Sequence, residues 1–168
     1  MSDEKKQNEN AEQQTRKGIA LNTQYIKDVS FENPRAPQGI LELKDRPNID
    51  IALDIDVTPV KDDIFEVALK INATAKDKEG KDVLFIVESV YAGIFTLHGL
   101  DEKEREPALL IYCPNLLFPF ARRVIADLTR DGGFPPLMLD PIDFSILFAQ
   151  RKAAEAKKDN PETTDTVQ

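Results

Sequence analysis

The side chains best suited to nucleophilic chemistry in this chain are its single cysteine and its single histidine, Cys113 and His98. These are the residue types of a Cys/His dyad, in which an imidazole accepts the proton of a thiol that then attacks the substrate. Cys113 lies between Tyr112 and Pro114 in an apolar stretch, and this setting favours a buried, inert thiol. A small hydrolase that uses this pair is therefore a minor alternative among the functions that the sequence allows.

Metal sites and nucleotide-binding loops are not indicated by the sequence. One cysteine and one histidine are too few for the ligand set of a structural zinc site, and one cysteine cannot form an intrachain disulfide. Gly132 and Gly133 lack both the Lys-Ser/Thr of a phosphate-binding loop and the third glycine of a dinucleotide fingerprint. Neighbouring acids such as Asp62 and Asp63 lack EF-hand spacing and indicate a solvated turn. We expect no catalytic residue, no metal and no cofactor.

Charge and composition narrow the classes of partner. The 22 basic and 30 acidic residues give a net charge of -8, which repels nucleic acids and anionic lipid surfaces. Residues 1–18 have no apolar segment of the kind that a signal peptide needs, and no run of apolar residues reaches the length of about 18 expected of a membrane span. We expect a cytoplasmic protein with no nucleic-acid partner and no direct membrane insertion.

The chain divides into a central domain and two polar ends. Residues 1–18 contain no aromatic or β-branched aliphatic side chain, and residues 151–168 contain one, Val167. Neither end buries enough apolar surface to offset its ordering entropy, so we predict a disordered tail over 1–18 and a folded domain over 19–150. The sequence RKAAEAKK has high helix propensity, which predicts a helix end followed by a disordered tail over 151–168.

Alternation of apolar and polar residues predicts four strands. The pattern is clear over residues 49–57 and 65–71, and the connection between them is short enough for an antiparallel hairpin. A polar break separates the second run from a third over 83–95, which completes a meander. Before these runs, an alternating stretch over 24–32 ends at the sequence NPRAP. We expect this first strand at a sheet edge, joined to the second by a long connection.

After Leu100 the apolar spacing becomes helical. Pro119 fits the first turn of a helix that runs to about Arg130 and stops at an Asp-Gly-Gly sequence. The short apolar run Ala108–Tyr112 predicts a separate helical piece. Asp143 is placed to cap a last helix. Strands followed by helices predict an α+β fold.

Acidic residues concentrate on one face of the predicted strands. Alternation places Asp28 and Glu32 on one side of the first strand and sets Ile86, Glu88 and Val90 on one side of the fourth. Further acids occupy the polar side of the two strands between them. An apolar centre with a charged rim is typical of a docking surface, although ordinary solubility charge explains the same pattern.

Three apolar runs in the second half of the chain exceed what one thin sheet needs for its core. They are Leu-Leu-Phe-Pro-Phe over 116–120, Phe-Pro-Pro-Leu-Met-Leu over 134–139 and the phenylalanine-bounded run 144–148. Surplus apolar surface indicates either association between copies or a groove for apolar ligands, while packing inside one chain remains the simpler explanation for most of these residues.

Four segments in order make the chain resemble the SecB family of protein-export chaperones. They are TQYIKDVSFENPRAP, GIFTLHG, YCPNLLFPFAR and GGFPPLMLDPIDFSILF, and the resemblance extends over about residues 24–150. It implies an α+β fold with a four-stranded antiparallel sheet and helices on one side. It also implies a non-enzymatic holdase that keeps export precursors unfolded and passes them to the SecA motor. A SecB-like chaperone dedicated to a toxin–antitoxin pair is the alternative within this resemblance.

The resemblance also implies an assembly and two kinds of site. The family forms a homotetramer, a dimer of dimers, and this chain's candidate interface residues are Tyr25, Val29, Phe31, Val87, Ser89 and Tyr91. The SecA motor is expected to dock on Asp28, Glu32, Ile86 and Glu88. The client groove is expected between Ile40, Leu41 and Leu43 of the first connection and Phe144, Leu147 and Phe148 of the last helix. A tryptophan common in that connection is missing here.

Overall fold

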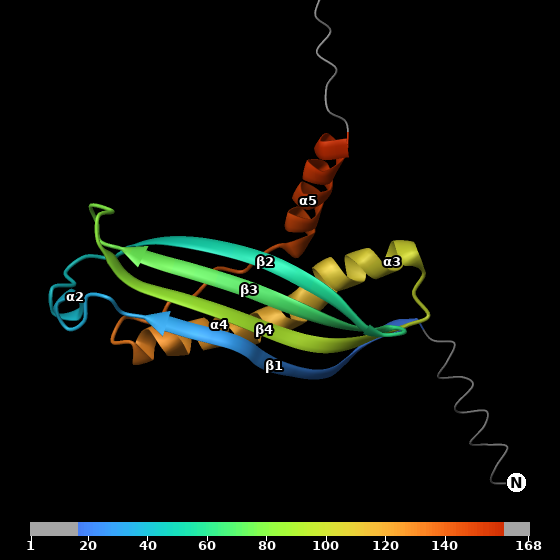
Figure 1. Cartoon of the computed structure of the whole chain (residues 1–168), viewed down its shortest axis with the longest axis horizontal. Coiled ribbons are helices and arrows are strands. Elements are labelled where there is room, and N and C mark those ends of the chain that lie inside the picture. The colour runs from blue at the N-terminus through green and yellow to red at the C-terminus, as the bar shows by residue number, and fades with distance from the viewer. Residues whose placement is uncertain (1–16, 160–168) are drawn as a thin grey trace, which may run out of the picture.

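A four-stranded antiparallel sheet forms one layer of the protein, and helices form the other (Figure 1). In this computed structural model, which describes residues 17–159, the strand order is β1-β4-β3-β2. The strands are β1 (Gly18–Glu32), β2 (Asn48–Lys61), β3 (Ile64–Lys76) and β4 (Val83–His98). The predicted α+β class is confirmed. Most of the two predicted tails, residues 1–16 and 160–168, lies outside the described residues.

The meander of β2, β3 and β4 has the predicted connections. Asp62, at a φ of 47°, turns the chain between β2 and β3, and Gly80, at a φ of 71°, lies in the turn before β4. β1 occupies the sheet edge, as predicted, and a long connection that contains the short helix α2 (Gln38–Leu41) leads from it to β2. The expected start near residue 24 is wrong, because Ile19 and Leu21 already pair with the end of β4.

A bulge in β1 changes which side chains share a face. The register between β1 and β4 shifts between Ile26 and Asp28, so that Tyr25 lies opposite Ala92 and Ile26 lies opposite Tyr91. Directly paired residues point to the same side of a sheet, and an extra residue exchanges the faces. Strict alternation predicted that Tyr25 shares a face with Val29 and Phe31. This prediction is wrong, because the bulge puts Tyr25 on the other face.

One continuous helix of 30 residues, Glu102–Asp131, replaces the two helical pieces that the sequence predicted. It consists of α3 (Glu102–Pro107), the π-helical segment η1 (Ala108–Tyr112) and α4 (Cys113–Asp131). Its start is fixed by a capping box, in which Glu104 N–H donates to Asp101 Oδ1 over 3.0 Å and Asp101 N–H donates to Glu104 Oε2 over 3.0 Å. Pro119 is inside this helix and does not begin it.

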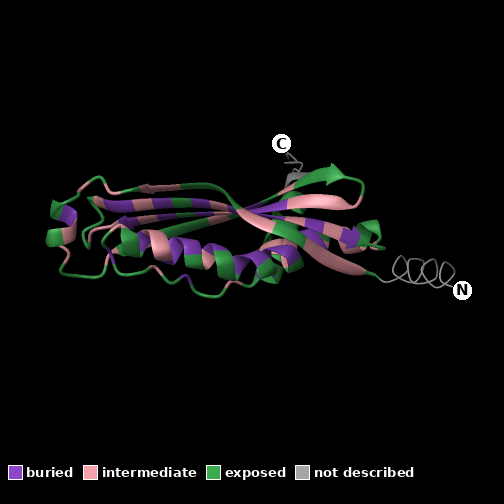
Figure 2. Ribbon diagram, turned by 90° about the horizontal axis from the view of Figure 1, so that it is seen from below, coloured by how far each residue is buried: buried purple, intermediate pink, exposed green. Residues whose placement is uncertain are grey.

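The long helix covers only one side of the sheet, and that side contains the core. α4 contacts β4, β3 and β1, and Figure 2 shows buried residues along the strands and along the helix beneath them. By length and composition this helix could cross a membrane, but half of its apolar window is buried inside the protein. Burial against a sheet accounts for its apolar composition equally well. After the helix, the backbone passes close to the Phe31 ring at Gly132, where any side chain would overlap that ring.

The last helix, α5 (Phe144–Asp159), projects away from the sheet on the β2 side (Figure 1). Asp143 caps it as predicted, because its Oδ1 accepts from the backbone N–H of Ser145 over 2.9 Å. The hydrogen bonds at this cap, from the Ser145 hydroxyl first, lower the pKa of the Asp143 carboxyl. The RKAAEAKK sequence continues the helix, also as predicted.

Candidate functional site

The four predicted docking residues lie together on the face of the sheet that no described helix covers, here called the open face. Even-numbered residues of β4 point to this face, and Glu32 pairs directly with Ile86. Ser30 pairs with Glu88, and its hydroxyl donates to that carboxylate over 3.4 Å. Asp28, opposite Val90, completes the group. The structure therefore brings the four side chains to one surface, although their role in docking stays a prediction.

Acidic residues of the open face fall into two groups that differ in pairing. One group has lysine partners: Glu66 with Lys27 at 2.5 Å, Asp50 with Lys76 at 3.3 Å, and Asp56 with Lys70. The second group makes no ion pair among residues 17–159, and its members are Asp28, Glu32, Asp54 and Glu88. Negative charge without an ion pair thus gathers where β1 and β4 meet. On β2, Asp54 lies opposite Lys70, whose pKa is raised first by its hydrogen bond to Asp56 and also by the charge of Asp54.

A shallow hollow of about 260 Å³ lies within this second group of acids. Its lining includes Asp28 from β1, Asp54 from β2 and Glu88 from β4, together with Val90. The docking prediction did not include Asp54. Its position was visible in the alternation of β2, but only the pairing of the strands shows that it lies near the other two carboxylates.

A network on the same face fastens β1 to β3 across β4. The Tyr25 hydroxyl donates a hydrogen bond to the Glu66 carboxylate, which also accepts from Lys27. The hydrogen bond to Glu66, together with burial, raises the pKa of Tyr25 to about 12. Hydrogen bonds from Lys27 and then Tyr25 hold the pKa of Glu66 below its usual value. The bulge after Ile26 makes this network possible, because it turns Tyr25 to the open face.

Three hollows follow β2 on the opposite, helix-covered face, and the third combines apolar side chains with the charged residues Asp56, Glu102, Arg105, Glu106 and Arg151. The first, of about 580 Å³, lies between the connection before β2 and the segment that follows α4. The second and third, of about 310 and 530 Å³, lie between β2, the long helix and α5. Each includes odd-numbered residues of β2, in order Ile49, then Leu53 and Ile55, then Ile55 and Val57. Together the three hollows form what we call the β2 groove.

The predicted groove residues divide into three groups. Leu43 lines the first hollow, and Leu147 and Phe148 line the second. Phe144 does not line the groove, because it is fully buried with its ring 6.0 Å from that of Phe118. The remaining two, Ile40 and Leu41, line none of the hollows described for residues 17–159. Ile40 packs beside Gly133, and Leu41 is 80% exposed.

Sequence reasoning missed much of the lining of the β2 groove. Phe134–Leu137 and Phe85 line the first hollow, and Leu109 and Leu110 of the long helix line the third. The surplus of apolar residues over 134–139 was the available signal. It did not show which strand these residues face, since that depends on the path of the chain after α4.

Comparison with known proteins identifies the family. The family model described as "Preprotein translocase subunit SecB" matches residues 12–155. The chain belongs to the SecB family. Protein-export protein SecB of Agrobacterium fabrum is 52% identical over 135 residues, which cover 80% of this chain and 83% of that protein. Its counterpart in Maricaulis maris is 53% identical over 133 residues, which cover 79% of this chain and 76% of the relative.

The fold is also that of a solved SecB-like chaperone. The Mycobacterium tuberculosis SecB-like chaperone in complex with a ChAD peptide from an antitoxin superposes with a TM-score of 0.63. The match covers 74% of this chain and 91% of that one. Sequence identity is 18%, so this similarity shows the shared fold alone.

The predicted interface residues of this chain are only partly at its surface. Val87 and Ser89 are buried within the single chain, and Phe31 stacks on Phe85 with ring centroids 5.8 Å apart. Val29 is 40% exposed. Tyr91 is buried and stacks on Phe120 at 6.2 Å, and Phe120 in turn is exposed. Any surface for association at these residues would therefore consist of Val29 and of exposed side chains such as Phe120, which covers Tyr91.

The two residues considered for nucleophilic chemistry differ in burial. Cys113 is fully buried in the core, and burial raises the pKa of its thiol to about 12. His98 is exposed at the end of β4. A thiol that stays protonated is a poor nucleophile, so this arrangement argues against the hydrolase alternative. Among residues 17–159 there is also no cluster of three or more potential metal ligands.

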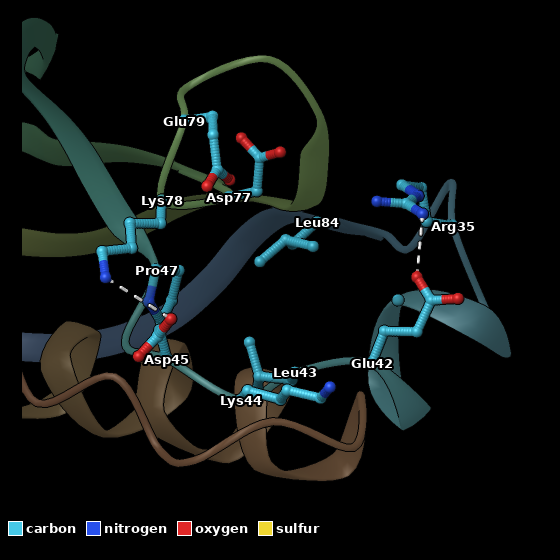
Figure 3. A pocket seen from close by; sticks show the side chains of 11 residues that line it. Arg35, Glu42, Leu43, Lys44, Asp45, Pro47, Asp77, Lys78, Glu79 and Leu84 are labelled. Carbon is cyan, nitrogen blue, oxygen red and sulfur yellow. Dashed lines mark hydrogen bonds and ion pairs between the residues drawn. The ribbon is translucent and has the colours of Figure 1, made fainter.

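A charged pocket lies beside the first hollow of the β2 groove (Figure 3). It holds about 210 Å³, and the connection over 43–47 separates it from the first hollow. Figure 3 shows two ion pairs at its rim, from Arg35 to Glu42 at 3.2 Å and from Lys78 to Asp45 at 3.7 Å. The acids and bases around it largely neutralise each other, so it presents no single charge to a ligand.

Proposed function

We propose that this chain is a holdase that binds unfolded export precursors in the cytoplasm, without ATP, and delivers them to the SecA motor. The observation that carries this function is the β2 groove, a row of three hollows along one strand whose lining is in large part apolar. Apolar surface of this extent is recognised by the hydrophobic effect, which is non-directional and so accepts many sequences. Only unfolded chains expose enough apolar side chains and backbone to occupy the row. Membership of the SecB family supports the same function.

Delivery to the motor is supported by the open face. Asp28, Glu32 and Glu88 make no ion pair among the described residues and share the open face with Ile86. Such a surface fits a basic segment with an apolar contact at its centre, and charge complementarity of this kind fixes orientation and speeds association. The proposal is that SecA supplies that basic segment.

Assembly into a homotetramer, a dimer of dimers, is the third part of the proposal. β1 is an edge strand, and on the helix-covered face it leaves Ile26 and Val29 exposed. Leu116 and Phe120 of α4 are also exposed, and the side-chain nitrogen Nε of Arg122 is buried without a partner in the described chain. Unpaired edges and exposed apolar patches are liabilities in a monomer, and a second copy would cover both.

The alternative within the same family is a chaperone for an antitoxin. The solved structure with an antitoxin peptide shares only the fold with this chain. Relatives at about half identity are protein-export proteins, which favours delivery to SecA. An antitoxin peptide added as a competitor for an unfolded precursor would distinguish the two.

The test is suppression of aggregation of an unfolded precursor, followed by light scattering without ATP. We expect the wild-type chain to suppress aggregation and to ignore the same precursor once folded. Phe148→Ser should weaken suppression, because Phe148 lines the second hollow. Ile146→Ser is the matched control, since Ile146 is 56% exposed on the same helix and lines no described hollow.

Two outcomes would contradict the proposal. Equal suppression by Phe148→Ser and the wild type, together with loss in Ile146→Ser, would place client binding elsewhere. If light scattering at micromolar concentration shows a monomer, the tetramer part of the proposal is contradicted, while client binding in the β2 groove is not affected.

A further inference from the structure

One side of the first hollow of the β2 groove is formed by residues 134–137, here called the wall. Its sequence is Phe-Pro-Pro-Leu, and proline has no backbone N–H, so only the two end residues can donate a backbone hydrogen bond. Phe134 N–H donates to the carbonyl oxygen of Thr129 over 3.1 Å, and Leu137 N–H donates to the hydroxyl Oγ1 of Thr129 over 2.9 Å. Both backbone donors of the wall therefore bind one residue.

The hydrogen bond at the first end of the wall belongs to the end of α4. Gly133 has a φ of 89°, and its N–H donates to the Arg130 carbonyl over 3.0 Å. Together with the bond from Phe134 N–H to the Thr129 carbonyl, this is a Schellman motif, which is built from the backbone alone. It places the Phe134 ring 4.9 Å from that of Phe85. This end of the wall does not depend on the side chain at position 129.

The hydrogen bond at the second end of the wall depends on the Thr129 hydroxyl. Thr129 is completely buried, and its Oγ1 lies 2.9 Å from the Ile125 carbonyl oxygen and 3.1 Å from that of Ala126. The hydroxyl donates its hydrogen to these helix carbonyls and so keeps its lone pairs for Leu137 N–H. Valine would occupy nearly the same volume, but it would leave Leu137 N–H without this acceptor.

We propose that Thr129 is a positioning residue of the β2 groove, whose hydroxyl holds the wall in the place that client binding requires. The Schellman motif fixes Phe134, and the rings of Pro135 and Pro136 restrict the backbone between the two ends. The position of Leu137 then decides how open the first hollow is. This inference rests on the proposed function of the groove.

The experiment measures binding and wall position in the same full-length chain. Binding of a labelled unfolded precursor is followed by fluorescence anisotropy, and hydrogen exchange reports on the Leu137 amide. Thr129→Val should raise the dissociation constant about three- to ten-fold, the range of one net hydrogen bond. The Leu137 amide should exchange faster in this variant, whereas the amides of β4 should keep their wild-type protection. General loss of stability would accelerate both.

Three further variants separate the hydroxyl from other effects. Thr129→Ser keeps the hydroxyl and should bind the precursor nearly as the wild type does. Thr129→Ala differs from Thr129→Ser only in the hydroxyl, so this pair repeats the comparison if Thr129→Val does not fold. Thr96→Val is the matched control, because it removes a half-buried hydroxyl that accepts from Asn22 Nδ2 over 2.7 Å and lines none of the hollows described for residues 17–159. It should leave the affinity unchanged.

The outcomes separate this inference from the proposed function. If the wild type binds the precursor and Thr129→Val binds it equally well, the assignment of Thr129 is overturned and the holdase stands. A Leu137 amide that stays protected in Thr129→Val overturns the assignment as well, since the hydroxyl would then not hold the wall. If the wild-type chain binds no unfolded precursor, the holdase itself fails, and the assignment of Thr129 fails with it.

Discussion

The two faces of the sheet differ in what is left uncovered. On the open face, side chains from all four strands meet solvent, and their charges are arranged in pairs and in one unpaired group. On the other face a single long helix packs on β4 and β3 and leaves the odd-numbered residues of β2 partly uncovered. Ile51 on that face is 49% exposed, whereas Val87 of β4 is completely buried. A helix narrower than its sheet thus creates the β2 groove.

Under the proposed function, the two faces differ in the kind of recognition that each would provide. Charged side chains at fixed positions on a rigid sheet favour one partner in one orientation. Apolar hollows impose shape but little direction, so they suit a chaperone that binds many unfolded sequences. Mutations on each face test this contrast separately.

The largest effect is expected from the residue that anchors α5 to the core. Phe144→Ala should lower the free energy of unfolding by about 3–5 kcal/mol, because it empties a fully buried site beside Phe118. Urea denaturation followed by circular dichroism measures this change. Phe148→Ala, four positions along the same helix, should cost much less stability and weaken client binding instead. Equal losses of stability in the two variants would mean that Phe148 belongs to the core and not to the groove.

A smaller effect is expected from the open face. Glu88→Lys should weaken SecA binding by about 1–3 kcal/mol, since it removes an attraction and introduces a repulsion for a basic segment. The side chain faces solvent, so suppression of aggregation should be retained. Calorimetry against a basic segment of SecA measures the loss.

Glu79→Lys provides the control for the open face. Glu79 is an exposed acid in the turn before β4, outside the group around Ile86. The substitution Glu79→Lys makes the same change in net charge as Glu88→Lys and should leave the affinity for SecA nearly unchanged. Equal losses in the two variants would show that affinity follows total charge, and the docking group would then have no special role.

The sequence predicted the open face better than the groove, for a physical reason. Period-two alternation is local, so Asp28, Glu32, Ile86 and Glu88 could be assigned to one face before the strand order was known. The bulge after Ile26 is the point at which this reasoning failed. Alternation cannot count an extra residue, and Tyr25 was therefore given the wrong face.

The groove depends on contacts between segments that are far apart in the chain. The resemblance to the SecB family implied Leu147 and Phe148 as groove residues, but it also implied Phe144, which packs inward. The helix start was also misplaced, because Pro119 resembles an N-terminal proline although the capping residue is Asp101. How far one helix covers a sheet is decided by tertiary packing, and no local pattern encodes it.

The smallest effect concerns the network that fixes β1 on the open face. Glu66→Gln should lower the free energy of unfolding by about 1 kcal/mol at neutral pH, because it weakens charge-assisted hydrogen bonds that Lys27 and Tyr25 donate. The pKa of Glu66 is depressed in the folded chain, first by Lys27. Its stabilisation is therefore present above the unfolded pKa and is lost as pH falls through the folded value. Denaturation at neutral and acidic pH measures this loss.

Tyr25→Phe separates the two donors in this network. It removes the hydroxyl that the bulge turns toward Glu66 and leaves the ion pair with Lys27 in place. The difference in free energy of unfolding between Glu66→Gln and the wild type should shrink as the pH falls below the pKa of an ordinary glutamate. Tyr25→Phe keeps the Glu66 carboxylate and its ion pair with Lys27, so its free energy of unfolding should keep part of this pH dependence. A constant difference between Glu66→Gln and the wild type across this range would mean that the carboxylate does not hold β1. The bulge alone would then determine which β1 side chains reach the open face.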